Sequence, residues 1–174
     1  MISADVEIDR ARERVEDKAF SLLSLQAPVA GDLRVVVAAL RMVTELERMG
    51  DLSVHVAKIA RLRVPNIAVP EEIRPTISRM AEVAEDMVKR VHDVITTRDV
   101  AAADEVRQDD EEMDQLRRRS FTELLSDSWD HGVEAAVDVA LLGRYYERIA
   151  DHAVTVANRV VFVVTGENPT SVDA

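Results

Sequence analysis

The sequence predicts an all-α fold built as tandem helical bundles. Only five glycines and five prolines interrupt 174 residues, whereas alanine, valine, glutamate and arginine are abundant, and such a composition favours long helices. Apolar residues also recur every three or four positions over most of the chain, as they do on the buried face of an amphipathic helix. With 47% hydrophobic and 32% charged residues, the chain is apolar enough to form a packed core.

Five helices follow from this spacing, over residues 5–24, 32–63, 71–97, 101–126 and 132–164. Pro28 ends the first connection, and Asp32 is a suitable N-cap for the second helix. Gly166 marks the end of the fifth helix. The expected buried stripe of the first helix is Ile8, Ala11, Val15, Ala19 and Leu22. That of the third helix is Ile73, Ile77, Met80, Ala84, Met87, Val91 and Val94.

An internal repeat organises the chain. Glu47-Arg48-Met49-Gly50-Asp51 recurs 100 positions later as Glu147-Arg148-Ile149-Ala150-Asp151. The preceding helices also match, because two aspartates four positions apart precede each motif. We therefore expect a first repeat over residues 1–64, a Pro-rich linker over 65–70 and a second repeat over 71–166. Residues 167–174 are expected to form a flexible tail.

Charge and composition exclude several classes of function. The net charge of −11 repels nucleic acid, so no nucleic-acid partner is expected. The chain has no cysteine, which excludes disulfides, zinc-thiolate sites and thiol catalysis. No apolar run reaches the length of about 20 residues that a membrane span needs, and residues 1–11 carry no signal-peptide core. These features suit a cytoplasmic protein that does not insert into membranes.

The repeated acidic pairs are the candidate site. Glu47 and Asp51 share one face of a helix because they lie four positions apart, as do Glu147 and Asp151. Each glutamate interrupts an apolar line that should face the bundle, where a carboxylate loses water and is costly without a cation. If the helices of each repeat pack as antiparallel hairpins, these residues face further acids. The facing acids are Asp5 and Asp9 in the first repeat, and Asp110 and Asp114 in the second.

Two interpretations of these acids remain open. An all-oxygen, multi-carboxylate site favours hard cations such as Mg²⁺, Mn²⁺, Ca²⁺ or Fe³⁺. Alternatively, arginines neutralise the acids and the helices form a purely structural module. The arginines available for this are Arg12, Arg48, Arg117, Arg144 and Arg148. His55 is interpreted as an ordinary helix histidine and His152 as a surface residue.

Motifs of known enzyme classes are missing from the sequence. It contains no Gly-rich phosphate loop, no Gly-x-Ser-x-Gly and no Glu-x-x-His, the last of which di-iron bundle enzymes require. A non-enzymatic, metal-binding regulator is therefore the leading hypothesis. The alternative is a metal-dependent hydrolase or redox enzyme built on a helical bundle.

Two segments resemble the signatures of the PhoU family. The first is Gln26-Ala27-Pro28-Val29-Ala30-Gly31-Asp32-Leu33-Arg34 followed by Leu46-Glu47-Arg48-Met49-Gly50-Asp51, and the second is Arg144-Tyr145-Tyr146-Glu147-Arg148-Ile149-Ala150-Asp151-His152-Ala153. The resemblance covers nearly the whole chain. It implies two similar three-helix bundles with multinuclear metal sites on Glu/Asp-x-x-x-Asp motifs.

The resemblance also implies a function and partners. Family members act in the cytoplasm as negative regulators of the phosphate regulon, together with the phosphate-specific ABC transporter and a PhoR-type sensor kinase. They often form dimers. For this chain it implies Fe, Mn, Mg or Zn ions on Glu47, Asp51, Glu147 and Asp151, with Asp5, Asp9, Asp110 and Asp114 as partner acids.

The sequence departs from the family pattern at its beginning. Family members start with a further helix before the one that holds Asp5 and Asp9. The first repeat is therefore expected to have two helices and the second repeat three. Two helices leave part of their apolar faces uncovered, and an exposed apolar patch usually finds a partner. We thus expect the chain to form homo-oligomers through the two-helix half.

Overall fold

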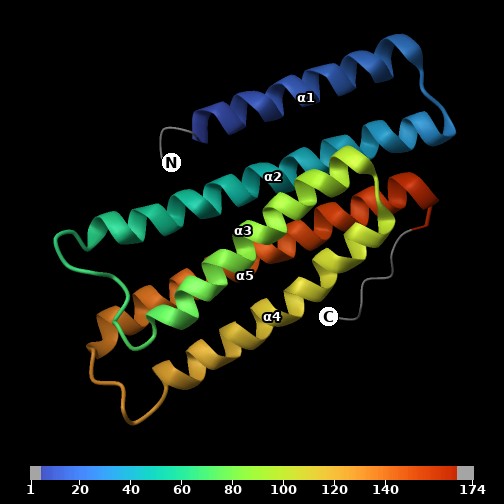
Figure 1. The fold of residues 1–174 in the computed structure, drawn as a ribbon. Coiled ribbons are helices and arrows are strands. Elements are labelled where there is room, and N and C mark those ends of the chain that lie inside the picture. Colours follow the sequence, from blue (N-terminus) through green and yellow to red (C-terminus); the bar gives the residue numbers. More distant parts are fainter. Residues whose placement is uncertain (1–4, 168–174) are drawn as a thin grey trace.

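The computed structural model describes residues 5–167, all of whose regular secondary structure is α-helical. The five helices are α1 (Asp5–Gln26), α2 (Ala30–Leu62), α3 (Arg74–Thr97), α4 (Val100–Leu124) and α5 (Gly132–Thr165). They run up and down along one common direction (Figure 1). The all-α prediction is confirmed, and each expected helix lies within three residues of its predicted bounds.

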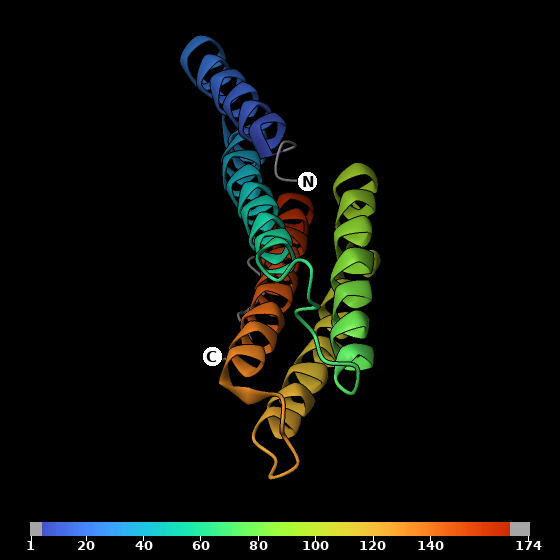
Figure 2. The ribbon, with the colours of Figure 1, turned by 90° about the vertical axis from the view of Figure 1, so that its left-hand side faces the viewer.

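The helices are arranged as a three-helix bundle with a two-helix extension. Helices α3, α4 and α5 pack against one another in every pairing. Helix α2 packs along α5, and α1 packs on the opposite side of α2 without reaching α3, α4 or α5. Figure 2 shows α1 and α2 standing out from the bundle in a row with α5. None of the described helices combines the length and apolarity needed to cross a membrane.

The core is aliphatic and methionine-rich, and it surrounds α5, which packs against α2, α3 and α4. All seven residues of the predicted α3 stripe are buried, and Met80 and Met87 are completely inaccessible to solvent. Met113 of α4 and Val139 of α5 are equally buried. The predicted stripe of α1 behaves differently: Ala19 is buried, whereas Ile8 and Val15 are exposed. Within residues 5–167, helix α1 packs against α2 alone, so its apolar face is only partly covered.

Local signals explain where the helices begin and end. The Asp99 side chain caps α4 by accepting a hydrogen bond from the backbone N–H of Ala101 at 2.8 Å. Gly166 ends α5 with a positive φ of 83°, a conformation that glycine adopts at little cost. The predicted N-cap of α2 is wrong. Val29 occupies that position and Asp32 lies in the first turn, where its charge interacts favourably with the helix dipole.

Two polar ties join α2 to α5. Near the end of α2, Arg63 donates hydrogen bonds to the buried Asp138 and to Glu134 of α5. Both partners raise the pKa of Arg63, chiefly through these hydrogen bonds. The second tie lies near the middle of α2, where Oε2 of Glu45 is 2.6 Å from Nδ1 of His152 on α5. The interpretation of His152 as a surface residue is therefore wrong, because packing of α2 on α5 buries it.

Candidate metal centre

The second repeat gathers four of the predicted acids. Asp110 and Asp114 lie on α4, and Glu147 and Asp151 lie on the adjacent helix α5. The pKa of Asp110 is raised to about 6, chiefly by burial and in addition by the negative charges of Asp151, Asp114 and Glu147. Like charges influence a carboxyl group in this way only at short range. The antiparallel packing of α4 and α5 thus places Glu147 and Asp151 near enough to Asp110 to influence its pKa.

Glu147 is the most buried member of this cluster, with 6% of its surface exposed. Both of its carboxylate oxygens are already engaged. Oε1 accepts a hydrogen bond from Arg117 of α4, and Oε2 accepts one from Arg144, one turn earlier on α5. The buried charge is therefore compensated by guanidinium groups in this structure. Asp151 is exposed to solvent and Asp110 is half-buried.

The first repeat has the same layout on α1 and α2. Arg12 Nη1 lies 3.7 Å from Oε1 of the half-buried Glu47. The position of a Cβ added to Gly50 would lie 2.8 Å from Cδ1 of Ile8, so the two helices approach closely here. Asp9 lies between these two α1 contacts in sequence and is half-buried, whereas Asp51 is exposed. Asp5 begins α1, and its side chain lies outside the described part of the structure.

The arginines repeat as well as the acids. Arg12 lies three positions after Asp9, and Arg117 lies three positions after Asp114. Each contacts the motif glutamate of its own repeat. In both residues Nε is buried and has no hydrogen-bond partner among the described residues. The equivalence of Arg12 and Arg117 is visible in the sequence once the two aspartate pairs are aligned, although their shared role is not.

The carboxylates of the two clusters have the chemistry that a hard cation prefers, but their present positions do not form a metal site. Carboxylate oxygens are the preferred ligands of Mg²⁺, Mn²⁺ and Ca²⁺, and burial together with the acidic neighbours raises the pKa of Asp110. Over residues 5–167, however, no three acidic or histidine side chains converge closely enough to hold one ion. Binding through Glu147 therefore requires Arg117 or Arg144 to release it.

Two further sequence candidates, His55 and Gly143, lie one helical turn from Asp51 and from Glu147 respectively. His55 is exposed on α2 and stacks on Tyr145 of α5, with ring centroids 5.3 Å apart. Its interpretation as an ordinary helix histidine is consistent with this contact. A Cβ at Gly143 would lie 3.7 Å from Oγ of Ser120 on α4, an ordinary van der Waals distance, so the approach of α4 to α5 here does not depend on glycine.

Comparison with known proteins identifies the family. The family model of the PhoU domain matches residues 1–60 and 77–160. The chain belongs to the PhoU family. Its relatives include phosphate-specific transport system accessory protein PhoU homolog 2 of Mycobacterium tuberculosis, which is 49% identical over 169 residues, or 97% of this chain and 79% of the relative. PhoU homolog 1 of Mycobacterium leprae is 50% identical over 156 residues, or 90% of this chain and 70% of the relative.

Solved PhoU structures share the fold. The phosphate transport system regulatory protein PhoU from Streptococcus pneumoniae is 25% identical and superposes with a TM-score of 0.83. The match covers 97% of this chain and 79% of that one. PhoU from Pseudomonas aeruginosa is 24% identical and superposes with a TM-score of 0.86. That match covers 95% of this chain and 79% of the Pseudomonas chain. The resemblance inferred from the signature motifs is thus confirmed for family and fold.

Proposed function

We propose that this PhoU-family chain is a cytoplasmic accessory protein of phosphate uptake that acts as a negative regulator of the phosphate regulon. The relatives that are about half identical over nearly the whole chain are phosphate-specific transport system accessory proteins, and this observation carries the proposal. Its partners would be the ATPase of the phosphate-specific ABC transporter and a PhoR-type sensor kinase. Its role would be regulatory rather than catalytic.

A loss-of-function experiment tests the regulatory role. In cells that lack this chain, a reporter driven by a phosphate-starvation promoter should be active even in phosphate-rich medium. Re-expression of the chain should silence the reporter, and a pull-down from phosphate-rich cells should recover the transporter ATPase or the sensor kinase. A reporter that responds to phosphate in the same way with and without the chain contradicts the proposal.

Metal binding is the second part of the proposal. Asp110, Asp114, Glu147 and Asp151 would hold a hard cation in the second repeat, and Asp5, Asp9, Glu47 and Asp51 in the first. The support is the accumulation of negative charge around Asp110, which a bound cation would relieve. Iron, manganese, magnesium or zinc ions all suit such a site in charge. The released arginines would then turn to solvent or to another anion.

Calorimetric titration of untagged, chelator-treated protein with Mn²⁺ tests this part. The unmodified protein should bind Mn²⁺, and its melting temperature should rise with the concentration of free Mn²⁺, because a ligand of the folded state stabilises it. The double variant Asp110→Asn/Asp151→Asn should lose the second-repeat binding. Its matched control, Asp127→Asn/Asp130→Asn, changes two acids outside the cluster and should bind normally. No heat and no thermal shift in the unmodified protein would overturn the metal sites.

A further inference from the structure

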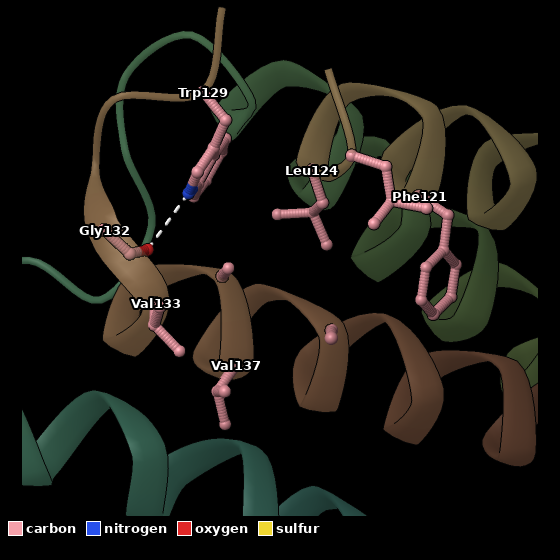
Figure 3. Close-up of a pocket in the computed structure, with 9 residues that line it drawn as sticks. Phe121, Leu124, Trp129, Gly132, Val133 and Val137 are labelled. Carbon is pink, nitrogen blue, oxygen red and sulfur yellow. Dashed lines mark hydrogen bonds between the residues drawn. The ribbon is translucent and has the colours of Figure 1, made fainter. Parts of the chain in front are cut away.

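An apolar groove that contains none of the motif acids lies at one end of the bundle. It is formed by the end of α4, the loop that follows and the start of α5, and it encloses about 450 Å³. Figure 3 shows Trp129 at one end of it, Phe121 and Leu124 of α4 on one side, and α5 with Val133 and Val137 on the other. Its lining residues are Phe121, Leu124, Leu125, Trp129, Gly132, Val133, Ala136, Val137 and Ala140.

The groove has small residues between large, exposed ones. Ala136 and Ala140 of α5 lie one turn apart and leave room for side chains from outside. At the edges Leu125 is 82% exposed and Val133 is 80% exposed, although burial of such aliphatic side chains is favourable. A contiguous apolar patch of this kind marks an interaction site. Two helices with a shallow channel between them accept the apolar face of a third helix.

Trp129 separates this groove from a second, acidic hollow. Trp129 is fixed by a 3.0 Å hydrogen bond from its Nε1 to the backbone oxygen of Gly132. The hollow beyond it encloses about 470 Å³, and Glu72, Glu123 and Asp130 are among its lining residues. Asp130 is 87% exposed, and its one ion-pair partner over the described residues is His131. Glu72 likewise pairs with His131, at 3.0 Å. Within residues 5–167, neither of these two exposed carboxylates forms an ion pair with a lysine or an arginine.

We propose that the groove and the hollow together bind one amphipathic helix of a partner protein. Its apolar face would lie on Ala136 and Ala140, and lysine or arginine residues at one end would reach Asp130 and Glu72. Charge complementarity selects this occupant. The inference concerns a surface outside the carboxylate clusters, so it stands whether or not these bind metal.

The groove contains its own reporter. Trp129 is the one tryptophan of the chain, so its fluorescence reports directly on occupancy. The probe is a synthetic peptide of about 18 residues, long enough to form a helix, with leucine at every third or fourth position and three lysines at one end. A twin peptide carries glutamate in place of lysine. The lysine peptide should shift the Trp129 emission with saturation, and the twin should bind about tenfold more weakly at low salt.

Two substitutions test the location. Ala136→Phe fills the groove and should abolish the fluorescence change, whereas Ala60→Phe, at an exposed position of α2, should not. If Ala136→Phe does not fold by circular dichroism, Leu125→Ser serves instead, because Leu125 is already exposed, and it should weaken binding severalfold.

A separate variant tests the proposed contact between Asp130 and the basic end of the helix. Asp130→Lys should remove the preference for the lysine peptide, and Asp93→Lys, at an exposed site on α3, should preserve it. An unchanged Trp129 emission, binding that survives Ala136→Phe, or equal affinity for the two peptides overturns the inference. So does a dimer of the unmodified chain that Ala136→Phe dissociates, since the occupant would then be a second copy.

Discussion

Glu147 has both carboxylate oxygens held by arginines, and this compensation is compatible with metal binding only if the arginines compete with the cation. Arg117 and Arg144 each donate to one oxygen, and Arg12 approaches Glu47 in the equivalent place. If the proposed metal binds, the arginine interpretation and the metal interpretation of the acids would be two states of one site. In the metal-free state the arginines limit the repulsion among carboxylates that would otherwise destabilise each cluster.

The competition predicts an unusual effect of losing an arginine. Arg117→Gln removes the donor to Oε1 of Glu147 and should tighten Mn²⁺ binding by about tenfold, or about 1.4 kcal/mol. The same change leaves Glu147 less well satisfied, so the metal-free variant should be destabilised by about 1–3 kcal/mol. Calorimetric titration and chemical denaturation measure the two effects. Arg119→Gln, which removes a surface pair with Glu123, is the control, and weaker Mn²⁺ binding by Arg117→Gln would show that this arginine supports the site.

Asp110 predicts a pH dependence of stability in chelator-treated protein. Its pKa is raised from 3.8 to about 6, so between these values the folded state binds more protons than the unfolded state. Stability should therefore fall as pH rises from about 4 to 6, and the loss should persist at higher pH. Asp110→Asn should remove this component and add about 1 kcal/mol at pH 7.5 after allowance for solvent screening, or about 2–4 °C in Tm.

The comparison of pH profiles isolates this residue from the other acids. The Tm of Asp110→Asn minus that of the unmodified protein should grow between pH 4 and 6, whereas the difference for the exposed Asp93→Asn should stay near zero. Parallel profiles for Asp110→Asn and the unmodified protein would contradict a raised pKa.

For single residues, the sequence predicts where the motif residues lie but not which residues contact them. Glu147 was predicted at the bundle face because it interrupts an apolar line, and it is buried. His152 was misplaced because its burial depends on α2, which no local pattern around His152 reveals. The metal ligands themselves stay a prediction.

The helices are the scale at which the sequence is most informative. The stripe on α3 is continuous and faces two partner helices, so every predicted residue is buried. The start of α2 shows the limit: Asp32 has the chemistry of an N-cap, yet the helix begins earlier, with Val29 extended before it. Similarly, α3 starts at Arg74 rather than at residue 71, because the helix places Pro75 in its first turn, where a missing N–H costs nothing.

The contact between α2 and α5 provides a prediction at the scale of elements. Asp138 is buried and depends on Arg63 for its hydrogen bonds. Arg63→Met should leave this carboxylate unsatisfied and lower the free energy of unfolding by about 1–3 kcal/mol, measured by urea denaturation. Arg61→Met, two positions earlier at an exposed site without an ion pair among the described residues, should change it by less than about 0.5 kcal/mol. Equal effects would mean that Arg63 does not tie the helices together.

At the scale of the whole molecule, the order of packing was beyond the sequence. The repeat predicted two similar units, but it did not say that α2 would lie on α5 or that α1 would contact α2 alone. Amphipathic patterns identify a buried face without identifying the helix that covers it. The pair between Glu45 and His152 is one of the specific contacts that determine this choice, and its partners are 107 positions apart.

The face between α1 and α2 leads to the last prediction, that the chain forms homo-oligomers. An apolar groove of about 380 Å³ runs between these helices, lined by residues that include Val15, Leu22, Val35 and Val36. We expect two copies to bury these grooves against each other, which would complete a four-helix arrangement. Light scattering at several concentrations should then show a mass that rises from the 19.4 kDa monomer toward the dimer.

Val15→Glu should shift this equilibrium to monomer, because burying an unpaired carboxylate at the contact is costly. Val88→Glu changes an equally exposed valine on α3 and should leave the association intact. A mass of 19.4 kDa at every concentration would refute self-association, and dissociation by both variants would place the contact elsewhere.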